Sequence, residues 1–138
     1  MAASSAPSAT PAPAALPLVI VADDDADMVL MIQEFLKLSG YASQVADNAA
    51  ALAPLLACQP VALMLDLIMP DGASEQIIDR LLANQSTLPV ILISALPPAA
   101  LDAHREQLAK RGLVIAAVLR KPFWMDELQR TLALAVAR

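Results

Sequence analysis

A run of apolar residues leads directly into a single aspartate in Val61-Ala62-Leu63-Met64-Leu65-Asp66-Leu67-Ile68-Met69-Pro70. An uninterrupted apolar run of this length, bounded by turn signals, is typical of a strand buried on both faces of a parallel sheet. A carboxylate that ends such a strand lies at the carboxyl edge of the sheet, where open α/β sheets bind their ligands. Taken alone, Asp66 fits equally well as the cap of a loop or of a helix start.

Three other apolar runs also end in side chains that can bind or react, and together they favour a ligand site. In chain order these endings are Asp23-Asp24 after residues 18–22, Ser94-Ala95 after residues 90–93, and Lys121 after residues 114–119. If all four strands are parallel, their carboxyl ends meet at one edge of the sheet. An acid pair, a single acid, a hydroxyl and a lysine are therefore predicted to share one pocket.

The spacing of apolar residues between these runs predicts helices that alternate with the strands. The predicted helices cover 26–39, 74–84, 98–111 and 125–136, with one more from a cap at Asp47 or Asn48 to residue 57, and the half-polar residues 41–45 suit an edge strand. The apolar residues of the first helix that we expect to face the sheet are Met28, Met31, Ile32, Phe35 and Leu36. The alternation predicts an α/β fold, a doubly wound five-stranded parallel sheet with helices on both faces.

The composition fits one domain of ordinary size in the cytoplasm. The chain has 138 residues, of which 58% are apolar, and a formal net charge of −5. Its longest uncharged stretch inside the domain, 85–101, is interrupted by prolines and does not predict a membrane span. No basic cluster indicates nucleic acid as a partner, and the single cysteine, Cys58, fits a reducing compartment. The Ala-, Pro- and Ser-rich residues 1–17 predict a disordered tail before one domain at 18–138.

In chain order, the motifs are Asp23-Asp24, Asp66-Leu67-Ile68-Met69-Pro70, Ser94-Ala95 and Lys121-Pro122-Phe123. This ordered set resembles the receiver domain of two-component response regulators, from about residue 18 to the C-terminus. The resemblance implies the flavodoxin-like strand order 2-1-3-4-5 and a stand-alone receiver of a single domain, without an output domain. It also implies a cis peptide bond between Lys121 and Pro122, which would direct the lysine into the pocket.

The predicted cluster of acids requires a counter-charge. Carboxylates that lie within a few ångströms of one another repel and cannot all stay ionised without one. Because the predicted ligands are all oxygen atoms, with no histidine or cysteine nearby, the metal should be a hard cation, Mg²⁺, with Mn²⁺ tolerated. The resemblance implies that Asp24 and Asp66 bind this metal directly, that Asp23 acts mainly through water, and that Ile68 contributes its backbone carbonyl.

The resemblance also assigns the roles in phosphoryl transfer. Asp66 matches the phosphoacceptor, which attacks a phosphohistidine on a histidine kinase or a histidine phosphotransfer protein. Ser94 matches the hydroxyl that binds the phosphoryl group, the small side chain of Ala95 leaves access beside it, and Lys121 matches the lysine that pairs with a phosphoryl oxygen. Such a protein assists phosphoryl transfer to its own aspartate and is not a conventional enzyme.

The resemblance further implies an output face. This face comprises the helix at 98–111, the strand at 114–119 and the helix at 125–136. It would bind an unidentified downstream protein target, or a second copy of the chain in a homodimer.

The chain departs from the family pattern in three places. Asp71-Gly72 follows Pro70 without a spacer, Ser74 stands where glycine is common, and Val118 stands where an aromatic side chain is usual in the activation switch. These departures leave a second hypothesis open, a receiver-fold adaptor or binding module that does not use phosphorylation. Since the chain keeps the complete set of acids, hydroxyl and lysine, the phosphoryl-accepting receiver is favoured.

Overall fold

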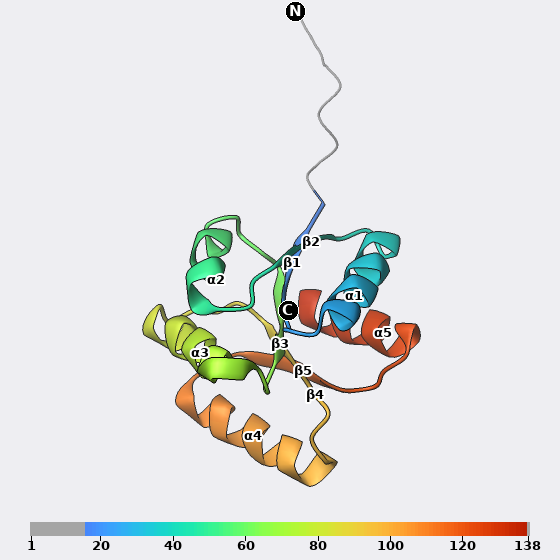
Figure 1. The fold of residues 1–138 in the computed structure, drawn as a ribbon. Coiled ribbons are helices and arrows are strands. Elements are labelled where there is room, and N and C mark those ends of the chain that lie inside the picture. The colour runs from blue at the N-terminus through green and yellow to red at the C-terminus, as the bar shows by residue number, and fades with distance from the viewer. Residues whose placement is uncertain (1–15, 138) are drawn as a thin grey trace, which may run out of the picture.

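Five parallel strands form one sheet in the order β2-β1-β3-β4-β5 in the computed structural model, which describes residues 16–137 (Figure 1). The strands are β1 (Leu18–Ala22), β2 (Ala42–Val45), β3 (Ala62–Asp66), β4 (Val90–Ser94) and β5 (Ile115–Arg120). Helices cover both faces of this sheet, which confirms the predicted doubly wound α/β class and its strand order. The predicted disordered tail, residues 1–17, falls almost wholly outside the described residues.

Each strand is followed by a helix. The helices are α1 (Ala26–Leu38), α2 (Ala49–Leu56), α3 (Ala73–Ala83), α4 (Pro98–Arg111) and α5 (Met125–Val136), with a short 3₁₀ turn, η2 (Pro70–Gly72), before α3. Capping residues lie just outside two of these helices: Asp25 accepts from the Asp27 N–H at 3.0 Å, and Asn48 accepts from the Ala51 N–H at 2.8 Å. None of the helices in the described part of the chain is both long and apolar enough to cross a membrane.

The core has two layers, one on each face of the sheet. Along β3, Leu63 and Leu65 pack toward α2, α3 and α4, whereas Ala62 and Met64 pack toward α1 and α5. All four side chains are fully buried. This two-sided burial explains why the strand is apolar throughout instead of alternating with polar residues.

The inner face of α1 is only partly the predicted one. Ile32 and Leu36 are fully buried as predicted, and Val29, which was not among the predicted residues, is buried with them. The residues that lie at the margin, only partly buried, are Met28, Met31 and Phe35. Because residues 28–32 are all apolar, their spacing does not fix the rotation of the helix, and packing against the sheet decides it.

The strand register brings the reactive strand ends together. Ala22 pairs with Leu65, and Asp66 pairs with Ile93. Ser94 follows Ile93, and Asp23 follows Ala22. The acids and the hydroxyl therefore lie at the same carboxyl edge of the sheet, as predicted.

Replacing Leu65 by alanine should lower the free energy of unfolding by about 2–5 kcal/mol, because this side chain is fully buried between the sheet and the helices on one face. Urea denaturation followed by circular dichroism measures the change. Leu134→Ala is the matched control, since it deletes the same atoms from a side chain of a residue that is 64% exposed, and it should cost less than about 0.5 kcal/mol. Equal losses in the two variants would contradict the position of Leu65 in the core.

Candidate functional site

Asp66 is the last residue of β3, and its carboxylate is held by two donors. The residue is only 5% exposed. Its Oδ1 accepts a hydrogen bond from the Ile68 N–H at 3.0 Å, and its Oδ2 accepts one from the Lys121 Nζ at 3.0 Å. Burial raises the pKa of the Asp66 carboxyl above its ordinary value, and the Ile68 N–H and the lysine oppose this rise only in part. The result is a desolvated, fixed carboxylate at the edge of the sheet.

Lys121 lies just after β5 and reaches across the end of β4 to two acids. Its Nζ is 2.8 Å from Asp23 Oδ2 and 3.0 Å from Asp66 Oδ2. Although burial lowers the pKa of the lysine, its close contacts with the two negatively charged carboxylates outweigh burial and raise that pKa above its ordinary value. The predicted cis peptide bond between Lys121 and Pro122 is confirmed.

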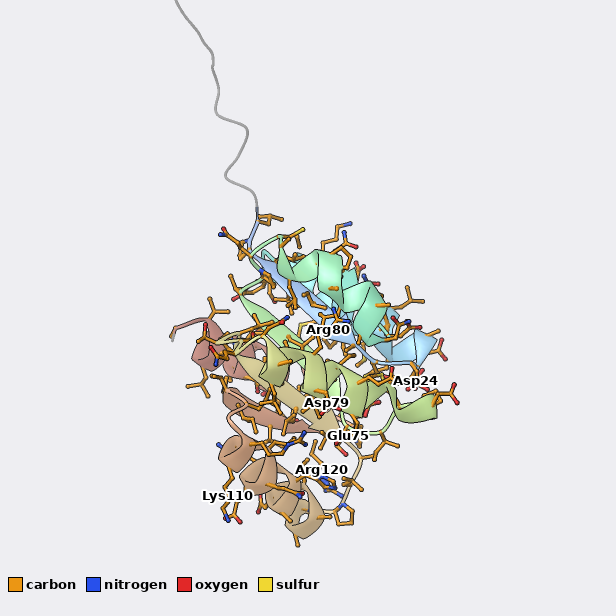
Figure 2. All side chains as sticks on the ribbon, turned by 90° about the vertical axis from the view of Figure 1, so that its left-hand side faces the viewer. Asp24, Glu75, Asp79, Arg80, Lys110 and Arg120 are labelled. Atoms are coloured by element: carbon orange, nitrogen blue, oxygen red, sulfur yellow. The ribbon has the colours of Figure 1, made fainter. Side chains whose placement is uncertain are left out.

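Asp23 and Asp24 bring two more carboxylates to the same edge. Carboxylate oxygens of Asp23, Asp24 and Asp66 lie within 4.8 Å of one another. Asp23 is 2% exposed and its Oδ1 accepts from the Asp25 N–H at 3.0 Å, whereas Asp24 is exposed at the surface (Figure 2). Asp25 therefore caps α1 through its side chain and steadies Asp23 through its backbone.

The three carboxylates fit a hard divalent cation. The Oδ2 of Asp23 is buried and accepts no hydrogen bond within residues 16–137. Its contact with the lysine ammonium, at 2.8 Å, is an ion pair. A buried acceptor of this kind is suited to a metal ion, and an all-oxygen donor set suits Mg²⁺. Ile68 donates its N–H to Asp66, and the use of its carbonyl as a further ligand stays a prediction.

Ser94 ends β4 beside the acids and Ala95 follows it, and the hydroxyl of Ser94 forms no hydrogen bond with these acids. Ser94 is fully buried, and its Oγ accepts from the Leu96 N–H at 3.1 Å. Its backbone carbonyl accepts from the Lys121 N–H at 2.8 Å, which ties the lysine to the end of β4. Ala95 is exposed, and its role in leaving access beside the hydroxyl stays a prediction.

Two residues that contact the site were not among the predicted ones. The buried Ser74 in α3 donates its hydroxyl to the backbone carbonyl of Asp66 at 2.7 Å. Arg120 donates its Nε to the carbonyl of Leu96 at 2.9 Å. The sequence signal for Ser74 was its place where glycine is common, and its contact depends on the left-handed backbone of Asp71 (φ 60°) just before α3.

An acidic edge with an inserted lysine, on a parallel sheet of order 2-1-3-4-5, defines a receiver-type α/β domain. The chain belongs to the response regulator receiver domain family, whose sequence profile matches residues 19–133. The match covers all five strands except Leu18, the first residue of β1, and reaches into the last helix.

Transcriptional regulatory proteins that are longer than this chain are similar to it over part of their length. The transcriptional regulatory proteins PrrA of Mycobacterium leprae and Mycobacterium tuberculosis are 38% identical to it over 82 residues, which are 57% of this chain. The matched part is 34% of the length of those relatives, so this chain spans about a third of them.

Solved receiver domains share its fold. The response regulator receiver protein from Burkholderia phymatum is 29% identical, with a TM-score of 0.71 over 88% of this chain and 95% of its own. The receiver domain of the Francisella response regulator 1452 is 27% identical, with a TM-score of 0.70 over 86% and 96% of the two chains. The Vibrio cholerae chemotaxis protein CheY4, at 22% identity and a TM-score of 0.71 over 86% and 98%, is similar in fold.

Mg²⁺ binding should require the acids, whereas the lysine should oppose it. Asp24→Asn removes a charged ligand and should weaken Mg²⁺ binding about tenfold or more, whereas Lys121→Met removes a competing positive charge and should tighten it. Isothermal titration calorimetry measures both. Asp27→Asn is the matched control, because it makes the same change in an exposed acid of α1 outside the cluster. Equal affinities in Asp24→Asn and Asp27→Asn would refute the metal assignment.

Ser74→Ala should lower the free energy of unfolding by about 1–3 kcal/mol, because it leaves the Asp66 carbonyl without this donor at the end of β3. Ser74→Thr keeps the hydroxyl and should recover part of that loss. Urea denaturation measures both variants. An alanine variant as stable as the wild type would show that the bond does not fasten α3 to the end of β3.

Proposed function

We propose that this receiver accepts a phosphoryl group on Asp66 from the phosphohistidine of a histidine kinase or a histidine phosphotransfer protein in the cytoplasm, with Mg²⁺ as cofactor and Mn²⁺ tolerated. The observation that carries the proposal is the Asp66 carboxylate itself. It is buried, fixed by the Ile68 N–H and Lys121, and it lies within 4.8 Å of two further acids. Family membership supports the same role.

The chemistry requires only one bond to form and one to break. An oxygen of Asp66 attacks the phosphorus, the phosphorus–nitrogen bond breaks, and its electron pair returns to the imidazole of the donor. Burial, which raises the pKa of Asp66, makes the carboxylate more basic and removes the water shell that would weaken its attack. Bound Mg²⁺ would neutralise charge between the three carboxylates and the incoming phosphoryl oxygens.

The remaining groups position and neutralise. The Ile68 N–H fixes one carboxylate oxygen at 3.0 Å, so the other can be directed at the phosphorus. The Lys121 ammonium, already 3.0 Å from Asp66, is close enough to move onto a phosphoryl oxygen. Ser94 offers its hydroxyl to another of these oxygens. The protein acts on its own aspartate once per donor and is not a conventional enzyme.

The output face of the proposal is formed by α4, β5 and α5, which would bind a downstream protein or a second copy of the chain. On this face, Trp124 at the start of α5 is 77% exposed, which is unusual for a tryptophan outside an interface. The PrrA relatives are transcriptional regulatory proteins by name. For this chain we propose a protein partner and not nucleic acid, because its net charge is −5.

A second candidate function is a receiver-fold adaptor that does not use phosphorylation. Val118 favours it, since this aliphatic side chain lies partly buried against the core layer under α4, at the position where an aromatic side chain is usual in the activation switch. Incubation with a small phosphoryl donor distinguishes the two candidate functions.

Incubation with acetyl phosphate and Mg²⁺ should add the mass of one phosphoryl group to the wild-type protein, as measured by intact-protein mass spectrometry. Asp66→Asn should abolish the adduct. Asp71→Asn is the matched control and should keep it, because Asp71 is exposed in η2 and asparagine tolerates the same left-handed backbone. An unmodified wild-type protein would favour the adaptor.

A further inference from the structure

The connection between β4 and α4 has few backbone hydrogen bonds available to hold it. Pro97 and Pro98 have no N–H group to donate, and α4 itself buries only Leu101 and Leu108. Two side chains from the ends of the strands contact the connection instead, and both of them contact Leu96.

Leu96 is held on its amide and on its carbonyl by different strands. Its N–H donates to the Oγ of Ser94 at the end of β4, at 3.1 Å. Its carbonyl accepts from the Nε of Arg120 at the end of β5, at 2.9 Å. Because Leu96 precedes a proline, its backbone is already restricted to extended conformations. The two bonds fix most of the freedom that is left.

Arg120 lies where its guanidinium can reach Leu96, and no ion pair in the described part of the chain competes for that guanidinium. It is the last residue of β5 and pairs in register with Ser94. Strand alternation puts its side chain on the same face as Val118, the face covered by α4, and Figure 2 shows it on this side, between α3 and α4. Within residues 16–137 its guanidinium enters none of the ion pairs.

The Ser94 hydroxyl is fully buried, so its usefulness depends on the direction of its hydrogen. A serine hydroxyl donates one hydrogen bond and accepts up to two. The Leu96 N–H occupies one acceptor position, and no acceptor for the hydroxyl hydrogen lies within bonding geometry in the described part of the chain. The hydrogen is therefore free to donate to an oxygen that arrives at Asp66.

We propose that Arg120 is a positioning residue for the phosphoryl site: it fixes Leu96, and Leu96 holds the Ser94 hydroxyl in the orientation that donates to a phosphoryl oxygen. This inference rests on the proposed role of Asp66 as the phosphoacceptor. What the position requires is a rigid, planar donor and not merely a positive charge, and a lysine does not supply that geometry. Without the arginine, Leu96 and the hydroxyl reorient and the prepared hydrogen-bond donor is lost.

A thermodynamic cycle on the full chain tests the route through Ser94. The probe is fluoroberyllate with Mg²⁺, which imitates a phosphoryl group on a carboxylate, and calorimetry gives its affinity. Arg120→Lys should weaken binding about fivefold in the otherwise wild-type chain, the factor for one hydrogen bond, and less than about twofold in the Ser94→Ala background. The control Arg111→Lys makes the same substitution at the far end of α4, where Arg111 pairs with Glu75 and Asp79, and should leave the affinity unchanged.

Equal losses in both backgrounds, or no loss in either, would overturn the proposal, because the effect would not pass through Ser94. A second readout needs neither the metal nor the probe. Exchange of the Leu96 amide hydrogen should be about fivefold faster in Arg120→Lys and unchanged in Arg111→Lys; unchanged exchange in Arg120→Lys also overturns the proposal. A wild-type chain that neither binds fluoroberyllate nor takes up a phosphoryl group would count against the proposed function, and the amide exchange would still decide whether Arg120 fixes Leu96.

Discussion

The ion pairs of Lys121 hold together an edge that its acids alone would push apart. The ammonium lies 2.8 Å from Asp23 and 3.0 Å from Asp66, and both acids are almost excluded from solvent. Without this group two buried like charges would face each other and repel. Since removing charges from water is costly, such a pair adds little net stability. Its value is that the ammonium offsets the repulsion between the two carboxylates and fixes them at this edge.

The strand order of the parallel sheet explains why a lysine is suited to pair with both acids. In the order β2-β1-β3-β4-β5, the strands that end in Asp23 and Asp66 are neighbours, while β5 is separated from β3 by β4. The group that follows β5 must therefore cross the end of β4, and a long side chain is needed. The Lys121 N–H bond to the Ser94 carbonyl fastens the starting point of that side chain to β4. The hydroxyl and the ammonium are thus positioned by the same contact.

The sequence was sufficient for the features that repeat along the chain and insufficient for those that depend on loop geometry. Apolar runs ending in Asp66 and Ser94 predicted the strands and the shared edge, because period and burial are local properties of a parallel strand. The bonds made by Ser74 and Arg120 could not be predicted in this way. Ser74 reaches the Asp66 carbonyl from the helix that follows a turn in which Asp71 adopts φ 60°, and Arg120 at the end of β5 contacts Leu96, which follows the neighbouring strand β4.

The charges at the edge also indicate which cation it can hold. Three carboxylates from Asp23, Asp24 and Asp66, set against the one ammonium of Lys121, leave a formal charge of −2 among the described groups. A divalent ion balances that charge, whereas a monovalent ion leaves an excess in a partly buried place. The proposed phosphoryl group on Asp66 would add further negative charge at the same edge, so the ammonium would be drawn from the carboxylates toward the new oxygens. On the proposed function, the lysine that stabilises the resting acids would then bind the product of phosphorylation, and Asp23 would be left to the metal.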